Sequence, residues 1–126
     1  MLLVTVLLGV LAGLAAGRFR RIEISGESMA PTLEPGDRIL VVRAGRPRPG
    51  DIVACVDPRE PNRTIVKRVA GVDGQEYTIL GDNFDASTDS RHFGPINANS
   101  IIGHVIFRYF PERRVGVVGR VPPATC

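Results

Sequence analysis

The stretch "TIVKRVAGVDGQEYTIL" (residues 64–80) predicts a β-hairpin. Two runs rich in β-branched and aromatic residues flank an Asp-Gly pair, which is a strong signal for a tight hairpin turn. Because side chains alternate between the two faces of a strand, Ile65, Lys67 and Val69 are expected to share one face. The hairpin therefore places the only lysine of the chain beside apolar neighbours.

Short apolar runs between turn signals continue through most of the chain after Arg21. None of them keeps a helical apolar period over the length of a helix, so we expect a mostly β, compact antiparallel domain with curved or barrel-like sheets. Two of the expected strands are preceded by Pro-Gly-Asp, and we interpret this as the same type of turn used twice. The segment "RAGRPRP" (43–49) is expected to be a polar surface loop. Further strands are expected at "RILVV" (38–42), "DIVACV" (51–56) and "SIIGHVIFRYF" (100–110).

Size and composition indicate one small domain and exclude several functions. The chain has 126 residues and a formal charge of +3, without a basic patch interleaved with aromatic residues, which argues against nucleic acid as a partner. Cys55 and Cys126 have neither CxxC spacing nor a histidine cluster beside them, so no metal and no other cofactor is expected. Cys55 is expected to be a small buried apolar residue, and a disulfide between the two cysteines stays open.

The N-terminal run "MLLVTVLLGVLAGLAAG" (residues 1–17) carries no charged side chain. As a helix it would measure about 25 Å, which is just enough to cross a bilayer with help from its flanks. We expect a retained, single-pass membrane anchor, and the arginines Arg18, Arg20 and Arg21 behind it favour a cytoplasmic position for the rest of the chain. The alternative is a cleavable signal peptide, because small residues end the run.

A candidate nucleophile lies in "ISGESMAPTLEPGD" (residues 24–37). Most serines in such turns only solvate a loop, and Ser28 would need a base to attack an amide. His92 lies in a turn-rich loop and His104 lies within an expected strand, while "GESMA" lacks the last glycine of a GxSxG elbow. A Ser-His-Asp triad is therefore disfavoured.

Lysine is the other possible base, because a Ser-Lys pair follows the same logic. Lys67 is the single lysine among sixteen Lys and Arg residues, and arginine does not release its proton at useful pH. Burial beside Ile65 and Val69 would lower the pKa of the amine, which could then take the Ser28 proton. In the alternative interpretation, this face of the strand points outward and Lys67 is an ordinary solvated lysine.

A second polar segment, "GDNFDASTDSRHFGP" (residues 81–95), has little apolar content. It could be a solvated turn, yet it holds hydroxyl groups able to orient a lysine amine, those of Ser87, Thr88 and Ser90. Asp89 and Arg91 could pair and hold the loop, although an exposed pair would add little stability.

Taken together, "SGESMAPTLEPGD", "IVKRVAGV" and "GDNFDASTDSRHFGP" resemble, in this order, the three sequence boxes of the signal peptidase I family. The matching segments lie between Ser25 and Pro95. The family consists of membrane-bound serine proteases with a Ser-Lys dyad, so the resemblance implies a β-rich catalytic core, a precursor protein or peptide as substrate, and a lipid bilayer as partner.

The resemblance also implies roles for individual residues. Ser28 matches the nucleophile, Lys67 the general base, and Ser87 the hydroxyl that orients the lysine. Gly26 and Met29 fall in the substrate and oxyanion region. The residues expected to support the site structurally are Asp82, Asn83, Asp89, Ser90 and Arg91.

The sequence departs from the family pattern in a few places. Gly26 stands where some members have a hydroxyl that helps to hold the oxyanion, so backbone N–H groups, that of Ser28 first, would have to do so. Phe84 stands where many members have arginine. Only a hairpin separates Lys67 from Gly81, so the large extra domain of some members is absent.

A narrower resemblance concerns "RPGDIVACVDPREPNRTIVKRV" (48–69), "DASTDSRHFGP" (85–95) and "FRYFPERRVG" (107–116). These segments resemble a small branch of the family, the nickel-type superoxide dismutase maturation proteases, whose members remove a short leader so that the new N-terminus can bind nickel. We therefore expect this maturation reaction, with general signal peptidase activity on secretory preproteins as the alternative.

The expected domain organisation is a membrane anchor (1–17), a β-rich protease domain (18–119) and a disordered tail (120–126). Besides a triad enzyme that uses His92, which would lose activity in His92→Ala, two other classes stay open. One is a self-cleaving repressor-type Ser-Lys protease, which would need a DNA-binding domain. The other is a non-catalytic, membrane-tethered β module, which a solvated Lys67 would favour.

Overall fold

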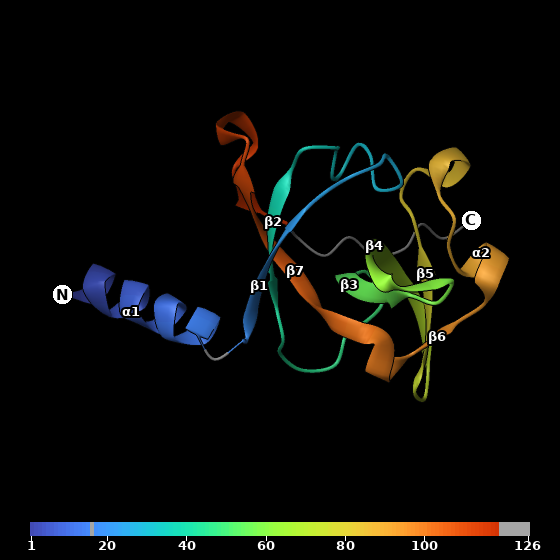
Figure 1. Ribbon diagram of the computed structural model, residues 1–126, viewed down its shortest axis with the longest axis horizontal. Helices are drawn as coiled ribbons and strands as arrows, with labels where there is room; N and C mark the ends of the chain where they lie inside the picture. Colours follow the sequence, from blue (N-terminus) through green and yellow to red (C-terminus); the bar gives the residue numbers. More distant parts are fainter. Residues whose placement is uncertain (16, 119–126) are drawn as a thin grey trace.

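One antiparallel sheet forms the body of the protein (Figure 1). The structure is a computed structural model that describes residues 1–15 and 17–118. Within these residues the strand order is β1-β2-β7-β3-β4-β5-β6, with β8 paired to β7. The strands are β1 (Phe19–Glu23), β2 (Arg38–Val42), β3 (Ile52–Asp57), β4 (Glu60–Asp73), β5 (Glu76–Leu80), β6 (Ile96–Asn97), β7 (Ile101–Phe110) and β8 (Gly116–Val117). The helical segments are α1 (Leu2–Ala15), η1 (Phe84–Ala86), α2 (Ser90–Phe93), η2 (Ala98–Ser100) and η3 (Glu112–Arg114).

The predicted hairpin is confirmed as β4 and β5, which pair with Asp73 opposite Glu76. Gly74 in the turn has a φ of +61°, which glycine adopts without steric cost. The strand β4 is longer than expected and begins at Glu60, because pairing with β3 carries it back to a second tight turn. The mostly β, antiparallel prediction is thus confirmed, and the strands expected at 38–42, 51–56 and 100–110 are present as β2, β3 and β7.

The strand β1 was not predicted. Its sequence is "FRRIE", and its charged residues carried no strand signal. It pairs with β2 over its whole length and lies at the edge of the sheet, where exposed charged side chains are tolerated.

The two Pro-Gly-Asp turns share one geometry, as predicted. Gly36 and Gly50 have φ values of +91° and +96°. The Asp37 carboxylate accepts a hydrogen bond from the Glu34 N–H at 2.9 Å, and Asp51 accepts one from the Arg48 N–H at 2.8 Å. The same local chemistry therefore starts β2 and β3.

Two buried clusters form the core, and β4 contributes to both because its side chains alternate. Val66 belongs to the first cluster and Val69 to the second. Cys55 also lies in the second cluster, fully buried, which confirms it as a small apolar core residue. Burial raises the pKa of its thiol to about 12. The possible partner Cys126 and the predicted disordered tail (120–126) lie outside the described residues.

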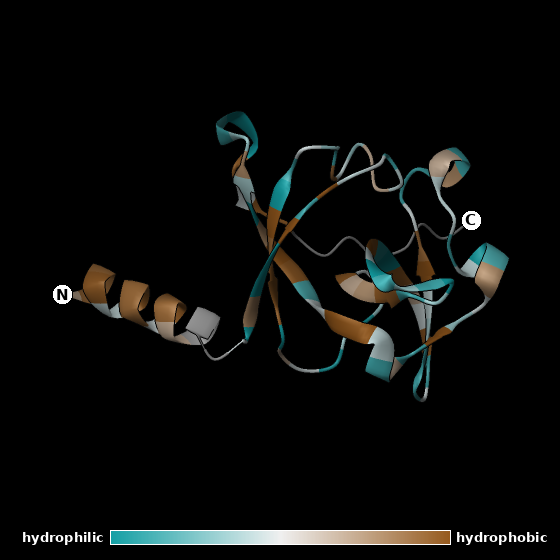
Figure 2. Cartoon of the chain, viewed as in Figure 1, coloured by the Kyte–Doolittle hydropathy of each residue, from teal (hydrophilic) through white to brown (hydrophobic). Residues whose placement is uncertain are grey.

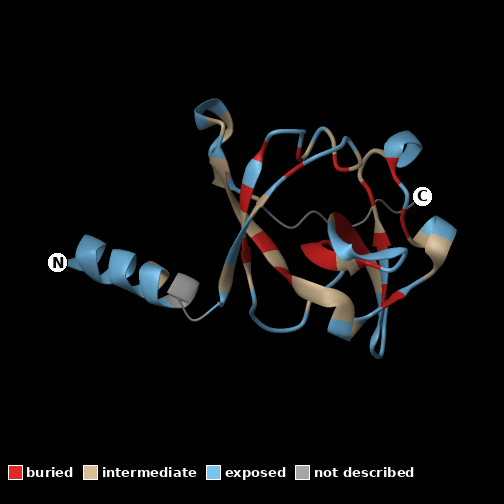
Figure 3. Cartoon of the chain, in the orientation of Figure 1, coloured by how far each residue is buried: buried red, intermediate tan, exposed pale blue. Residues whose placement is uncertain are grey.

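The helix α1 projects from the sheet domain at the start of β1 (Figure 1). It is apolar, and most of its residues between Leu2 and Ala12 are exposed (Figures 2 and 3). Its 14 residues correspond to about 21 Å, short of the roughly 30 Å of a hydrocarbon core. Within residues 1–15 and 17–118, no helix combines the length and the apolar character needed to cross a bilayer, so the predicted transmembrane helix is not supported.

Candidate active site

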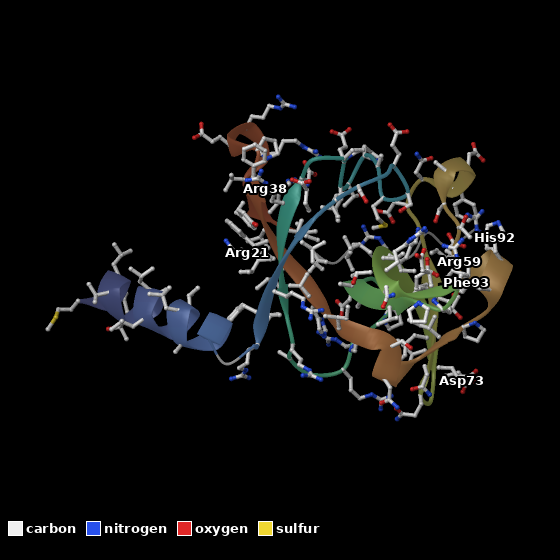
Figure 4. The ribbon with its side chains drawn as sticks, in the orientation of Figure 1. Arg21, Arg38, Arg59, Asp73, His92 and Phe93 are labelled. Atoms are coloured by element: carbon white, nitrogen blue, oxygen red, sulfur yellow. The ribbon has the colours of Figure 1, made fainter. Side chains whose placement is uncertain are left out.

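A cleft of about 360 Å³ opens between the loop that follows β1 and the first half of β4. Ser28 lines it from the loop and Lys67 from the strand, with Ala86 and Thr88 closing one side. Near Arg59, another cleft residue, the short helix α2 brings His92 and Phe93 to the same end of the molecule (Figure 4). The two residues predicted to form a dyad are thus brought to one cavity from positions far apart in the sequence.

The loop that carries Ser28 is held at both of its ends. The Ile24 N–H donates to the Asp37 carbonyl, and the Gly36 N–H donates to the Ile24 carbonyl, each at 2.8 Å. Met29 is only 1% exposed and packs in the first core cluster, so its side chain anchors the loop, and it also lines the cleft. Gly26 reaches the cleft with a φ of +103°, a conformation that side chains with a Cβ rarely adopt.

Lys67 lies inside the protein, with 4% of its surface exposed. It is opposite Val53 in the β3–β4 pairing and shares its face with Ile65, as the alternation predicted. Burial lowers the pKa of the Lys67 amine below the ordinary value of 10.5, while the negative charge of Asp89 opposes this shift. The interpretation of a solvated lysine is therefore wrong, and the feature that would favour a non-catalytic module is absent.

A hydrogen-bond chain orients this amine. The Lys67 Nζ donates to Ser87 Oγ at 3.0 Å, and the Ser87 hydroxyl donates to Asp89 Oδ2 at 2.7 Å. Since the Ser87 proton is directed at the carboxylate, the Ser87 oxygen accepts from the lysine. Asp89 is fully buried, and although burial alone would raise its pKa, hydrogen bonds from Arg91, Gly81 and Ser87 hold the pKa well below its usual range.

Arg91 fastens the loop around this chain. Its guanidinium donates to the Asp89 carboxylate at 3.0 Å and to the Phe84 carbonyl at 2.8 Å. The Arg91 Cζ also lies 4.0 Å from the centre of the Phe84 ring, which is a cation–π contact. Phe84 is the residue that stands where many family members have arginine. Ser90 contributes by accepting from the Ile79 N–H at 2.8 Å, which joins α2 to β5, so it does not reach the lysine as one interpretation allowed.

Asn83 connects the two loops of the site. Its backbone N–H donates to the Ser28 carbonyl at 2.9 Å, and its side chain donates to the Glu27 carbonyl at 3.0 Å. The carbonyl side of Ser28 is therefore fixed by the loop that also carries Ser87.

Asp82 ties the same loops to β4 through two residues that the sequence analysis missed. It accepts from the Thr32 hydroxyl at 2.6 Å and from two nitrogens of Arg68 at 2.8 and 2.7 Å. A signal for Arg68 was present, because an arginine on a strand face beside Val66 needs a carboxylate partner when the face is buried. This pair holds the residue next to Lys67 against the Ser28 loop.

Replacing Asp82 by alanine should lower the free energy of unfolding by about 3 kcal/mol, because it leaves the buried Arg68 guanidinium without its partner. Urea denaturation checks this value. Asp85→Ala, which removes an exposed carboxylate from the same loop, is the control and should change stability by less than about 0.5 kcal/mol. Equal effects of both variants would show that the Asp82–Arg68 pair does not hold the site together.

Gly81 is a further residue that was missed. A Cβ at this position would lie 2.6 Å from the Ser28 carbonyl oxygen and would overlap the Ser87 side chain. The backbone at Gly81 therefore passes between the two hydroxyl-bearing residues at a distance that only glycine permits. Its role is visible only once both loops are in place.

Neither histidine lines the cleft. The His92 Nδ1 accepts from the Asp89 N–H at 3.3 Å and caps α2. His104 lies beside Asp51 on β7, in a different cavity. The geometry offers no Ser-His-Asp triad around Ser28.

The Ser28 hydroxyl makes no hydrogen bond within the described residues, so the contact expected with Lys67 is not formed in this structure. Contacts of this kind tighten when substrate binds. The Ser28 N–H is also without a hydrogen-bond acceptor among residues 1–15 and 17–118, which leaves it able to bind a negatively charged oxygen.

Comparison with known proteins places the chain in a class. The family described as "Signal peptidase, peptidase S26" matches residues 1–78 and 75–110, a range that contains Ser28, Lys67 and the loop from Gly81 to Pro95. A serine peptidase is the class that this match defines. The chain belongs to the signal peptidase S26 family.

The relatives carry two kinds of name. "Mitochondrial ATP-independent inner membrane protease subunit 1a" of Arabidopsis thaliana is 36% identical over 74% of this chain and 71% of its own length. "Mitochondrial inner membrane protease subunit 1" of Homo sapiens is 30% identical over 78% of this chain and 74% of its own. "Signal peptidase I" of Leptolyngbya laminosa is 27% identical over 94% of this chain and 80% of its own.

Proposed function

We propose that this chain is a Ser-Lys endopeptidase that removes N-terminal leaders from precursor proteins at a membrane. The observation that carries the proposal is the buried Lys67, held by Ser87 in the same cleft as Ser28. A lysine with a lowered pKa beside a serine is the arrangement that activates a hydroxyl nucleophile. The activity is assigned to the β-rich segment 18–119 that the sequence predicted.

In the proposed reaction, neutral Lys67 takes the proton of Ser28 as the Ser28 oxygen attacks the scissile carbonyl. The developing oxyanion accepts a hydrogen bond from the Ser28 N–H, which has no other acceptor in the described part of the chain. Lys67 then gives the proton to the leaving amine, and water hydrolyses the acyl-enzyme. Ser87 keeps the amine in place through both proton transfers because its oxygen accepts from Lys67.

The cleft suits an extended peptide. Residues 22–29 line one wall, and Thr64, Ile65 and Val66 of β4 line the other. A substrate strand between these walls would pair through its backbone, with alternate side chains entering the cleft.

The names of the relatives favour a general leader peptidase over a protease dedicated to nickel-type superoxide dismutase. The names found are inner membrane protease subunits and signal peptidase I, and these support the activity that was the alternative. The predicted maturation of a nickel-type superoxide dismutase has no support from them, so we propose general leader removal as the function. The names also support work at a membrane, and α1 is the apolar segment that would contact it.

Incubating the full chain with two precursors should distinguish these substrates. One precursor is a secretory preprotein and the other a nickel-type superoxide dismutase precursor, and N-terminal mass spectrometry reads the products. We expect the preprotein to be trimmed after a small residue by the wild type and not by Ser28→Ala. Trimming of the dismutase precursor alone would contradict general leader removal. It would instead support a protease dedicated to maturing nickel-type superoxide dismutase.

The buried base predicts a pH dependence. Because the folded-state pKa of Lys67 lies below 10.5, kcat/KM should rise as pH increases through that lowered pKa and level off before 10.5 is reached. The unfolded chain binds more protons in this window, so the contribution of Lys67 to stability also rises with pH. Peptide cleavage rates across a pH series check the profile, and a rising limb centred on 10.5 would contradict a buried base.

A further inference from the structure

A cavity of about 220 Å³, separate from the cleft and from the one beside His104, lies where α1 joins the sheet. Arg18, Arg20 and Arg43 line it. The Arg43 N–H donates to the Arg18 carbonyl at 2.9 Å, which continues the β1–β2 pairing, and Arg20 is opposite Val41. Residues opposite one another on paired strands share a face, so the three guanidinium groups gather on one side of the sheet edge.

These three cations lack the carboxylate partners that most other arginines have. Within residues 1–15 and 17–118, no ion pair joins Arg18, Arg20 or Arg43 to an acidic side chain. Positive charges held close together repel one another, and an anion bound between them would offset that repulsion by attracting each of them. The arginines that do form ion pairs in the described structure are Arg38, Arg59, Arg63, Arg68, Arg91, Arg108 and Arg114.

The rest of the cavity is not simply basic. Val41, Val56, Ile101 and Ile102 line it with apolar surface, while Asn99 and Ser100 from the η2 turn add an amide and a hydroxyl. Arginine forks bind phosphate oxygens well, and apolar surface suits the carbon atoms that a phosphodiester carries. The combination fits a phosphate attached to an organic group better than it fits a fully hydrated ion.

The position of the cavity indicates where such a phosphate would come from. Gly17, which directly precedes Arg18, is part of its lining. The helix leading to it is apolar and exposed, with Leu2 and Leu3 at 80% and 84% exposure (Figures 2 and 3). A helix of this kind is stable against lipid tails, and anionic lipid surfaces attract basic residues that flank such a segment.

We propose that Arg18, Arg20 and Arg43 form a binding site for the phosphate headgroup of an anionic phospholipid. The site seats the sheet domain on the membrane surface at the base of α1. The inference rests on the membrane part of the proposed function and is independent of the Ser28–Lys67 chemistry, because the two cavities share no residue.

Co-sedimentation of the full chain with lipid vesicles tests the site. The vesicles contain phosphatidylcholine alone or phosphatidylcholine with phosphatidylglycerol. The site variant is R18Q/R20Q/R43Q, and the matched control is R21Q/R48Q/R113Q, which removes the same charge from exposed arginines outside the cavity. We expect the site variant to bind the phosphatidylglycerol vesicles about tenfold more weakly than the control does.

Equal losses in the two variants would overturn the site in favour of diffuse charge attraction. Wild-type binding that is the same without phosphatidylglycerol would overturn the need for an anionic lipid. Release from the vesicles by millimolar glycerol 3-phosphate, at constant ionic strength, would support the site, because a soluble phosphate would then compete with the lipid headgroup for the three arginines. Ser28→Ala should bind vesicles like the wild type while failing to cleave, so loss of the peptidase proposal and loss of this one can be told apart.

Discussion

Lys67→Arg should reduce kcat/KM for leader cleavage by about 10³- to 10⁴-fold, which is the contribution expected of a general base. Arginine keeps a positive charge at the same position, yet it does not release its proton, so it cannot accept the Ser28 proton. The buried position makes the effect sharper, because burial lowers the pKa of the native amine, whereas an arginine at the same place stays charged. Cleavage of a synthetic leader peptide, followed by mass spectrometry, measures the loss.

A buried guanidinium could also disturb folding, so Lys67→Met is measured alongside. Methionine matches the length of the lysine stem and carries no charge, which suits a position opposite Val53 and on the same strand face as Ile65. We expect Lys67→Met to melt within a few degrees of the wild type and to be equally inactive. Full activity in either variant would rule out the dyad.

Gly81→Ala should reduce activity by about 100-fold, the scale associated with a displacement of reacting groups by about 1 Å. The new methyl group would meet the Ser28 carbonyl oxygen and the Ser87 side chain at once. Either the loop from Gly81 or the loop of Ser28 must then move, and the hydrogen bond from the Gly81 N–H to Asp89 is weakened with it. Peptide cleavage and thermal melting together measure the change.

Gly71→Ala is the matched control, because a Cβ there meets nothing within 4 Å. Gly71 lies on β4 opposite Thr78 of β5, the strand that ends just before Gly81, and does not have a positive φ, so the same chemical change should be nearly neutral. Comparable activity losses in both glycine variants would show that the close approach at Gly81 does not position the site.

Much of the fold could be predicted because its signals are local. The Asp-Gly turn between β4 and β5 and the two Pro-Gly-Asp turns each specify their own backbone geometry. The strand β1 could not be predicted, because its residues are charged and its pairing with β2 depends on a partner distant in sequence. The same holds for α2, a single turn that Asp89 caps only after the loop has folded.

The sequence predicted which residues make up the site, and the structure showed how they are buried and hydrogen-bonded to one another. Strand alternation correctly placed Ile65 and Val69 on the face of Lys67, but it left open whether that face is inside. Met29 was assigned to the substrate region; it does line the cleft, and the structure adds that its side chain is also part of the core. Arg68 and Thr32 were missed, since their importance arises only from a shared partner, Asp82.

The sequence by itself determined the strand pattern, the turns, and the three segments that carry Ser28, Lys67 and Ser87, since each depends on neighbours within a few residues. Only the tertiary structure decided that Lys67 is buried and that Ser87 donates to Asp89 while accepting from the lysine. The physical reason is that desolvation and hydrogen-bond direction are set by groups brought together from distant segments. A lysine becomes a candidate base through those surroundings, and no local pattern contains them.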